Sequence, residues 1–306
     1  MLIPSPPTLG RALALVWAVA AGFLPGTTTA SAIPVSNNTD GSLTARAAAA
    51  PPWTAQHGLT SAGYQSTYDT LVRGGYHLTF ASGYTYNNDP RFAAIWEKSA
   101  TAAWATHHGM TSAQYQSLFN TYTAQGYRPR LVNGYTVSNS ARFIAIWDKS
   151  PTPGWIARHG LSSAQYQAAF DSFVGQGYRL AHVSGYAEGG QARYAALWEK
   201  NTAGAAPWFA RHGMTSAQYQ ASVDSLVAQG YRPTLVSGYV VGNVDYYAAI
   251  WEKSAVAGWI ARHGLTSAQY QAEFDKWSGQ GYRLTVVSAY TLNSNRDRYA
   301  AIWVKK

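Results

Sequence analysis

One phrase occurs five times along this chain, and this repetition constrains the fold more than any other feature. The copy at Trp259–Gln271 reads WIARHGLTSAQYQ, and its histidine recurs at steps of about 50 residues. A second phrase, Ile-Trp or Leu-Trp followed in most copies by an acidic residue and Lys, closes each copy. The recurrent residues are His57, His108, His159, His212 and His263, and Trp96, Trp147, Trp198, Trp251 and Trp303. Such self-similarity indicates one supersecondary unit copied in tandem, with each copy packed mainly on its neighbours.

Each copy contains the signature of one helix. A Thr or Ser with Gln three residues later is a capping box, which only Gly63 in the first copy breaks. In the third copy Tyr166, Phe170 and Phe173 follow at helical spacing, and Gly177 marks the end of the helix. The pattern predicts helices over Thr60–Gly74, Thr111–Gln125, Ser162–Gln176, Thr215–Gln229 and Thr266–Gln280. It also predicts a positive φ at Gly126, Gly177, Gly230 and Gly281.

A β-hairpin is predicted after each helix. In the third copy two strand-like runs, Tyr178–Tyr186 and Arg193–Glu199, flank the polar turn Glu188–Gln191. The fold class is therefore an α+β repeat protein of five helix-plus-hairpin units. Short connections favour a closed or nearly closed, propeller-like ring, and an open solenoid is the alternative. Turn residues differ between copies, as expected of exposed tips where a binding surface would diversify.

The N-terminus reads as a secretory signal peptide over residues 1–32. Arg11 precedes the apolar run Ala12–Leu24, and Ala30-Ser31-Ala32 is a small-x-small cleavage site. The run is shorter than the roughly 20 apolar residues of a membrane span. Residues 33–52 read as a flexible lead-in, and residues 53–306 as the repeat domain. Its units are predicted at residues 53–103, 104–154, 155–207, 208–258 and 259–306.

Composition narrows the partners that we expect. The chain has no cysteine and 12 Trp, so a secreted array must be held by aromatic packing rather than by disulfides. Removing residues 1–32 leaves 23 − 1 = 22 basic residues against 14 acidic ones, a balance of about +8. This charge favours anionic surfaces such as acidic wall polymers, although most basic residues recur once per unit and would be dispersed. We expect no nucleic-acid partner and no membrane span.

The two phrases carry a family resemblance over all five copies, from Trp53 to Lys305. The unit, W-x-A-R-H-G-[LM]-T-S-A-Q-Y-Q followed by Q-G-Y-R, V-S-G-Y and R-Y-A-A-I-W-E-K, resembles the structural repeat in the N-terminal domain of fungal polyglycine hydrolases. The same repeat occurs as a tandem-repeat domain in bacterial secreted proteins. In polyglycine hydrolases, proteases that cut glycine-rich linkers of plant chitinases, it precedes a catalytic domain resembling serine β-lactamases. The resemblance implies a secreted scaffold without an established activity of its own.

The motifs that would bring catalysis are missing from the sequence. No Ser stands three residues before any Lys, so the Ser-x-x-Lys of a β-lactamase-like centre is absent, as are a nucleophile elbow and a zinc-protease helix. The chain ends three residues after Trp303, so we expect no second, catalytic domain in it. The alternative is a hydrolase whose site lies at the ring axis or between units. Departures from the repeat at His107, His182 and Glu188 would mark that site.

The repeated Arg-His-Gly triplet is the first candidate ligand site. It comprises Arg158, His159, Arg211, His212, Arg262 and His263. A histidine just before a helix N-cap could contact an anion held there. We favour the structural interpretation, in which the imidazole bonds a backbone carbonyl of the neighbouring unit. No second histidine or carboxylate accompanies the triplet at ligand spacing, so we predict no metal and no cofactor.

Two other sets recur once per unit. The tyrosines that end the first hairpin strand, near the variable turn, would stack on sugars or grip a protein if exposed, or serve as ordinary strand residues. They are Tyr84, Tyr135, Tyr186, Tyr239 and Tyr290. An arginine after Gly-Tyr and an acid after the second Trp are expected to pair across the hairpin or the unit boundary, a structural role. These are Arg128, Arg179, Arg232 and Arg283, with His77 in the first unit, and Glu97, Asp148, Glu199 and Glu252, with Val304 in the last unit.

The sequence therefore predicts a secreted, extracellular, non-catalytic scaffold that binds a cell-wall polysaccharide or an extracellular protein. The alternatives are a secreted hydrolase, or an accessory protein of a polyglycine hydrolase-like catalytic chain.

Overall fold

The computed structural model describes residues 52–305, so the predicted signal peptide and most of the lead-in lie outside the described residues. The described chain is an α+β repeat of five units, each a strand, a helix and two further strands. The first unit comprises β1 (Trp53–Thr60), α1 (Ser61–Arg73), β2 (His77–Tyr86) and β3 (Asp89–Glu97). The second comprises β4 (Trp104–Met110), α2 (Ser112–Ala124), β5 (Arg128–Val137) and β6 (Ser140–Asp148). The third comprises β7 (Trp155–Leu161), α3 (Ser163–Gly175), β8 (Tyr178–Glu188) and β9 (Gln191–Lys200). The fourth comprises β10 (Trp208–Thr215), α4 (Ser216–Ala228), β11 (Arg232–Val241) and β12 (Val244–Glu252). The fifth comprises β13 (Trp259–Leu265), α5 (Ser267–Gly279), β14 (Tyr282–Leu292) and β15 (Arg296–Lys305).

The helices begin and end where the sequence predicts, to within a residue. The residue before each helix is its N-cap, and in α2 to α5 the Thr or Ser and the Gln of the capping box bond reciprocally. In α1 the Thr60 hydroxyl accepts from the backbone of Gly63, which has no side chain to return the bond. Gly126, Gly177, Gly230 and Gly281 have φ between 81° and 83°, as predicted.

The predicted hairpins are also confirmed. Four have a two-residue turn in which both residues have a positive φ, for example Asn87 at 50° and Asn88 at 66°, and the fifth has a three-residue turn whose first two residues have a positive φ. Two consecutive left-handed residues match the right-handed twist of the flanking strands, which explains why these turns use Asn, Gly and Ser.

Each unit contains a third strand that the sequence analysis missed. The first phrase forms a strand that pairs antiparallel with the last strand of its unit, so every sheet has three strands in the order β1-β3-β2. The phrase lacks regular alternation because a β-bulge interrupts it, and the register shifts between Arg158 and Leu161 in the third unit. Gly160 lies in this bulge with φ of 71°, which explains the glycine after every recurrent histidine.

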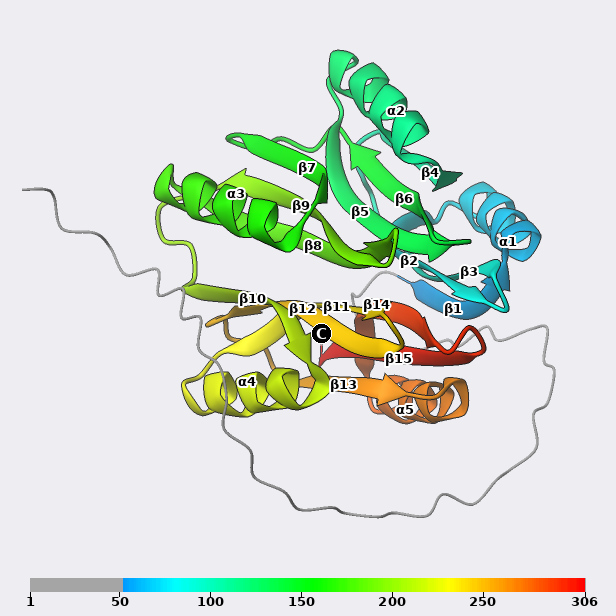
Figure 1. Cartoon of the computed structure of the whole chain (residues 1–306). Helices are drawn as coiled ribbons and strands as arrows, with labels where there is room; N and C mark the ends of the chain where they lie inside the picture. The colour runs from blue at the N-terminus through cyan, green and yellow to red at the C-terminus, as the bar shows by residue number, and fades with distance from the viewer. Residues whose placement is uncertain (1–51, 306) are drawn as a thin grey trace, which may run out of the picture.

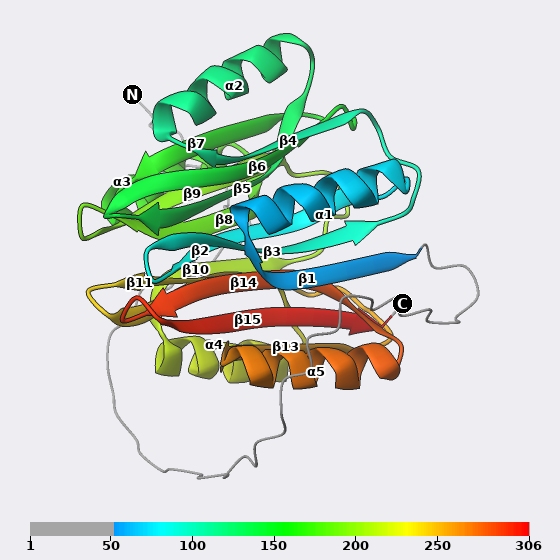
Figure 2. The same ribbon diagram turned by 90° about the vertical axis from the view of Figure 1, so that its right-hand side faces the viewer.

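The helices lie on the outside of the molecule and the sheets lie inside (Figures 1 and 2). The first hairpin strand of each unit contacts the first hairpin strand of the next unit. These strands are β2, β5, β8, β11 and β14, and β14 also contacts β2. The five sheets remain separate three-stranded sheets, and none closes on itself.

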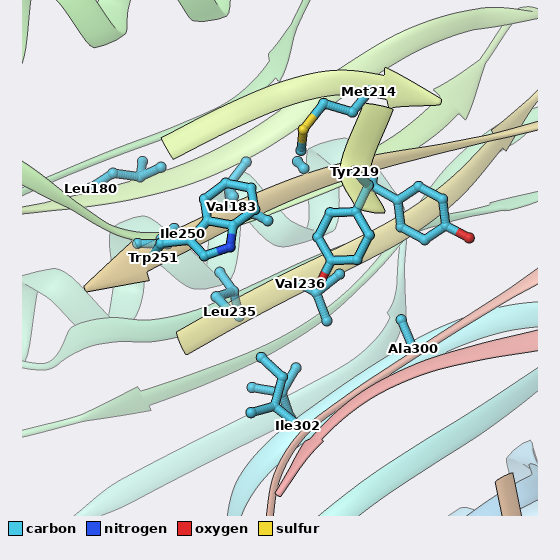
Figure 3. Packing of buried hydrophobic residues seen from close by; sticks show 14 of the residues in the cluster. Leu180, Val183, Met214, Tyr219, Leu235, Val236, Ile250, Trp251, Ala300 and Ile302 are labelled. Atoms are coloured by element: carbon cyan, nitrogen blue, oxygen red, sulfur yellow. The ribbon is translucent and has the colours of Figure 1, made fainter. Parts of the chain in front are cut away.

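The core of each unit lies between the helix and the last strand. The second recurrent Trp has no exposed surface in any unit, and the helix tyrosine, such as Tyr219 above Trp251, packs over it. Figure 3 shows this packing for the fourth unit, where Met214, Leu235 and Ile250 lie around the pair. The first recurrent Trp is only partly buried, so the second one contributes more to the core of each unit.

Candidate functional site

A depression of about 340 Å³ lies at the hairpin-tip end of the molecule, and all five units line it. Each unit contributes the end of its first hairpin strand and its turn. Most of its lining residues are glycines or small polar residues, and within residues 52–305 no Lys, Arg, Asp or Glu lines the depression. The amide and hydroxyl side chains of its wall and rim include Asn88, Asn133, Thr136, Ser138, Asn139, Asn243, Thr291 and Ser294.

The strand-end tyrosines lie beneath this depression and are buried rather than exposed. Tyr84, Tyr135, Tyr186, Tyr239 and Tyr290 are each between 2% and 4% exposed, which fits the second of the two interpretations above, that of strand residues. The backbone N–H of the bulge glycine Gly160 donates to the Tyr186 hydroxyl at 3.0 Å. Burial raises the pKa of Tyr84 to about 12. These tyrosines therefore border the site as neutral, fixed groups.

A glycine of the preceding unit makes room for each tyrosine ring except that of Tyr84, because the fifth unit has Ala289 at this position. A Cβ added to Gly185 would lie 2.3 Å from the Tyr239 ring, and one added to Gly134 would lie 2.3 Å from the Tyr186 ring. The same close approach occurs between Gly83 and Tyr135. The Gly-Tyr pair in the Val-Ser-Gly-Tyr phrase is thus one contact repeated between units.

The residue before that glycine also forms a hydrogen bond to a neighbouring unit. Its side chain accepts a hydrogen bond from the backbone N–H at the glycine position of the preceding unit. The pairs are Gly83 with Asn133 at 2.8 Å, Gly134 with Ser184 at 3.0 Å, Gly185 with Ser237 at 3.1 Å, Gly238 with Ser288 at 2.9 Å and Ala289 with Ser82 at 3.1 Å. The last pair joins the fifth unit to the first. The sequence analysis missed this set, although a serine in the same phrase of most units was a visible signal.

Several turns at the rim are tied to the next turn. Asn88 exchanges two hydrogen bonds of 2.9 Å with Ser138, and Asn139 accepts from the backbone of Gly189 and Gly190. The backbone of Asn87 donates to Ser294 of the last unit. The rim residues are exposed, so their remaining donors and acceptors face solvent.

The recurrent histidines lie between units, away from the depression. His159 Nε2 is 3.1 Å from the hydroxyl of Ser112, the first residue of helix α2, and the His159 ring meets Tyr115 edge-on at 4.8 Å. His212 and His263 repeat this contact with Ser163 and Ser216, and His57 of the first unit makes it with Ser267 of the last. The predicted link to the neighbouring unit is present, but its partner is a serine hydroxyl rather than a backbone carbonyl.

Burial lowers the pKa of every one of these histidines. The pKa of His212 falls to about 4, and those of His57, His108, His159 and His263 also fall because the imidazoles lose water. They are therefore neutral at neutral pH, which removes the positive charge that an anion site at this place would need.

The arginines of the triplet point to the helix of their own unit. Arg158 donates to the Ala157 carbonyl and lies over the Phe173 ring, and Arg211 donates to the Ser222 hydroxyl at 2.8 Å. Arg262 forms an ion pair of 3.3 Å with Glu273. Arginine and histidine of one triplet thus diverge, and their role in binding a ligand stays a prediction.

The arginine and the acid that recur in each unit pair across unit boundaries. Arg128 binds Glu199, Arg179 binds Glu252, and Arg283 lies 3.5 Å from Glu97. In each pair the arginine belongs to one unit and the acid to the next, with the first unit following the fifth. Arg128 also lies 3.6 Å from Asp148 across its own hairpin.

The three departures from the repeat occupy different places. His107 Nε2 lies 2.7 Å from the Tyr122 hydroxyl beside helix α2, and Glu188 forms an ion pair of 3.9 Å with Arg193 near a turn. His182 is buried, donates to the Val132 carbonyl at 3.1 Å, and faces Phe80 of the first unit. Each has its own structural contact, with a different part of the described chain.

Two further findings concern the described residues alone. Between residues 52 and 305 no group of three or more His, Asp or Glu side chains is placed to hold a metal ion. None of the five helices in that range is long and apolar enough to cross a membrane.

The architecture defines a class: a tandem-repeat α+β scaffold whose units place one glycine–tyrosine phrase around a shared depression. Comparison with protein families matches five segments to the family described as polyglycine hydrolase-like, structural repeat. The matched segments are residues 50–99, 101–150, 152–201, 205–254 and 256–306. Since these cover most of the chain, the protein belongs to this family of polyglycine hydrolase-like structural repeats.

Proposed function

We propose that this protein is a secreted, non-catalytic scaffold whose five units form a closed ring and bind a neutral segment of an extracellular polysaccharide in the tip depression. The observation that carries the proposal is the depression itself. All five units line it, and they line it with uncharged hydrogen-bonding groups. Its volume falls in the range of small-molecule sites, roughly 300–1,000 Å³.

The chemistry of the lining favours sugars. Amide side chains both donate and accept, and hydroxyls do the same, so they complement a ligand whose hydroxyl groups also do both. A charged ligand would find no counter-ion in the lining. The buried tyrosines fix the strands beneath, so the exposed rim groups are held in place before a ligand arrives, which lowers the entropic cost of binding.

Closure of the ring is supported by contacts between the last and first units that match those at the other boundaries. Ala289 donates to Ser82, His57 contacts Ser267, and Arg283 pairs with Glu97. The hydroxyls of Tyr84 and Tyr299 lie 2.7 Å apart across the same boundary. A closed arrangement gives the depression a continuous wall.

Secretion is supported by the order of charge, apolar run and small residues in residues 1–32. Export would give the repeat domain access to wall polysaccharides. Because the domain has no cysteine, it would need no disulfide formation outside the cell to stay folded.

The binding proposal is tested with a bulky substitution inside the depression. Ala187 lines the depression and is partly buried, so Ala187→Trp should obstruct it. Ala168→Trp, on the exposed face of helix α3, is the matched control. On a glycan array and in wall-polymer pull-downs, the parent chain and Ala168→Trp should bind the same neutral glycan and Ala187→Trp should not. Equal binding by both variants would place the ligand elsewhere, and no glycan binding by the parent chain would contradict the proposal.

A second candidate follows from the family match: an accessory protein for a polyglycine hydrolase-like catalytic chain, holding a glycine-rich peptide. The backbone of such a peptide offers the N–H and C=O groups that the lining complements. Oligoglycine in the same Ala187→Trp assay separates the candidates. Hydrolysis of that peptide, lost on substitution of His107, His182 or Glu188, would instead favour the hydrolase alternative.

A further inference from the structure

The ladder of ion pairs between units is interrupted at two of the five boundaries. Between the first and second units His77 stands in place of the arginine, and between the fourth and fifth units Val304 stands in place of the acid. Arg128, Arg179 and Arg283 each reach the acid that follows the second Trp of the next unit. Their side chains are 7%, 18% and 6% exposed, so each guanidinium has left most of its water for that partner. Removing the carboxylate from such a site leaves a desolvated cation unpaired, which is costly.

Between the fourth and fifth units the carboxylate is replaced by a methyl-terminated side chain. The arginine here is Arg232, and the position of the acid holds Val304, which is buried. Arg232 Nε donates to the carbonyl and hydroxyl oxygens of Ser254, at 3.3 and 3.1 Å. Within residues 52–305 no carboxylate lies within ion-pair distance of Arg232. Glu252 stands opposite it in the hairpin but is bound by Arg179.

A hollow accompanies the missing acid. Its volume is about 380 Å³, and its lining comprises Arg232, Thr234, Val256, Thr285, Val304 and Lys305. It lies where β11 begins, whereas the tip depression lies where β11 ends, so the two are separate. Burial lowers the pKa of Arg232, and the negative charge of Glu252 offsets this effect only in part. Lys305, exposed beside Val304, adds a second positive charge.

We propose that this hollow is a binding site for an aliphatic carboxylate. The ligand occupies the place of the glutamate side chain that the next unit supplies at the Arg179 boundary. Its carboxylate lies on the terminal nitrogens of Arg232, and its short hydrocarbon arm lies against Val256 and Val304. Planar guanidinium and carboxylate groups match in a two-bond fork, which makes carboxylates better partners here than spherical anions.

Propionate tests the site, because it is the glutamate side chain beyond the Cα atom. In an NMR titration of the full chain with ¹⁵N-arginine, propionate should shift the Arg232 Nε resonance in a saturable way. Val304→Glu supplies the missing carboxylate internally, so it should raise the melting temperature and weaken propionate binding at least tenfold. Arg232→Gln should abolish binding. Arg128→Gln, which removes an arginine that already has a partner at another boundary, is the matched control and should retain it.

The outcomes separate the alternatives. Undiminished propionate binding in Val304→Glu, or in Arg232→Gln should the first variant fail to fold, would overturn the proposal. Sulfate binding as tight as propionate would reject the requirement for a hydrocarbon arm. A peptide with one glutamate, acetyl-Ala-Glu-Ala-amide, distinguishes a site for acidic side chains of a partner from one for free acids only. None of these outcomes depends on the tip depression.

Discussion

At the scale of single residues, the same side chain recurs in successive units where a residue of the next unit limits its size. Gly185 is a clear case because the Tyr239 ring of the next unit occupies the space of its missing side chain. The last unit has Ala289 at this position, so the constraint applies to the other four boundaries. Identical residues recur because identical contacts recur, which is how a repeat protein differs from a fold with one asymmetric site.

Gly185→Ala should lower the free energy of unfolding. The new methyl group would lie 2.3 Å from a buried ring, and overpacking of this kind costs about 1–3 kcal/mol. Chemical denaturation measures the change. Gly175→Ala is the control, because its added methyl meets no atom within 4 Å and lies at a helix end. It should be neutral or slightly stabilising, and equal losses in both variants would contradict the steric argument.

Trp198→Ala should cost about 3–5 kcal/mol, because a side chain with no exposed surface leaves a cavity. In the described part of the chain its indole N–H has no hydrogen-bond partner, so packing alone accounts for the loss. Trp155→Ala, at a partly buried position of the same unit, should cost less. Thermal unfolding compares the two, and an unchanged midpoint for Trp198→Ala would show that this Trp does not support the core.

At the scale of elements, the contact between units is made by a bulged strand on the start of the preceding helix. The bulge at His159-Gly160 in β7 places the imidazole over Ser112 and Tyr115 of helix α2. The helix start is thus both capped by its own unit and contacted by the next one. This contact sets how one unit is placed on its neighbour.

His159→Ala should lower thermal stability by about 1–3 kcal/mol, because the Ser112 hydroxyl and the Tyr115 ring lose their partner. A double-mutant cycle with Ser112→Ala isolates the hydrogen bond. If the two residues act together, the double variant should lose less stability than the sum of the losses in the two single variants. If His159→Ala leaves the melting curve unchanged but abolishes binding of a ligand, the Arg-His-Gly steps are the functional site instead.

At the scale of the whole molecule, acid should weaken the array. Burial lowers the folded-state pKa of all eight histidines below the ordinary value of 6.5, to about 4 for His182 and His212. Between pH 6.5 and 4 the unfolded chain therefore binds more protons than the folded chain. Stability is full above pH 6.5 and is lost as the pH falls through this window. Melting temperatures across the window measure the loss, and a flat profile would contradict it.

His182→Leu should remove part of this sensitivity. Its shift from 6.5 to about 4 corresponds to about 3 kcal/mol, since one pKa unit is about 1.4 kcal/mol. Leu131 and Leu235 occupy the matching strand position in neighbouring units, so the replacement is compatible with the fold. The variant should melt at a higher temperature than the parent at pH 4.5. If the melting temperature falls between pH 7 and pH 4.5 by as much as in the parent chain, the acid sensitivity comes from the other histidines.

The sequence by itself determined the features that depend on local chemistry. Period, helix starts, helix ends and hairpin turns follow from capping residues, glycines and Asn-rich turns, each read within a few positions. The family also followed, because both phrases recur in all five copies.

Only the tertiary structure decided what each repeated side chain contacts. The strand in the first phrase stayed hidden because the bulge at Gly160 breaks its alternation. The burial of Tyr186 does not follow from the local sequence, because it depends on Gly134, in another unit and about 50 residues away. The arrangement of Arg232 opposite Val304 likewise appears only when two units are packed. Local sequence specifies the unit, and the packing of one unit on the next decides which of its residues face solvent.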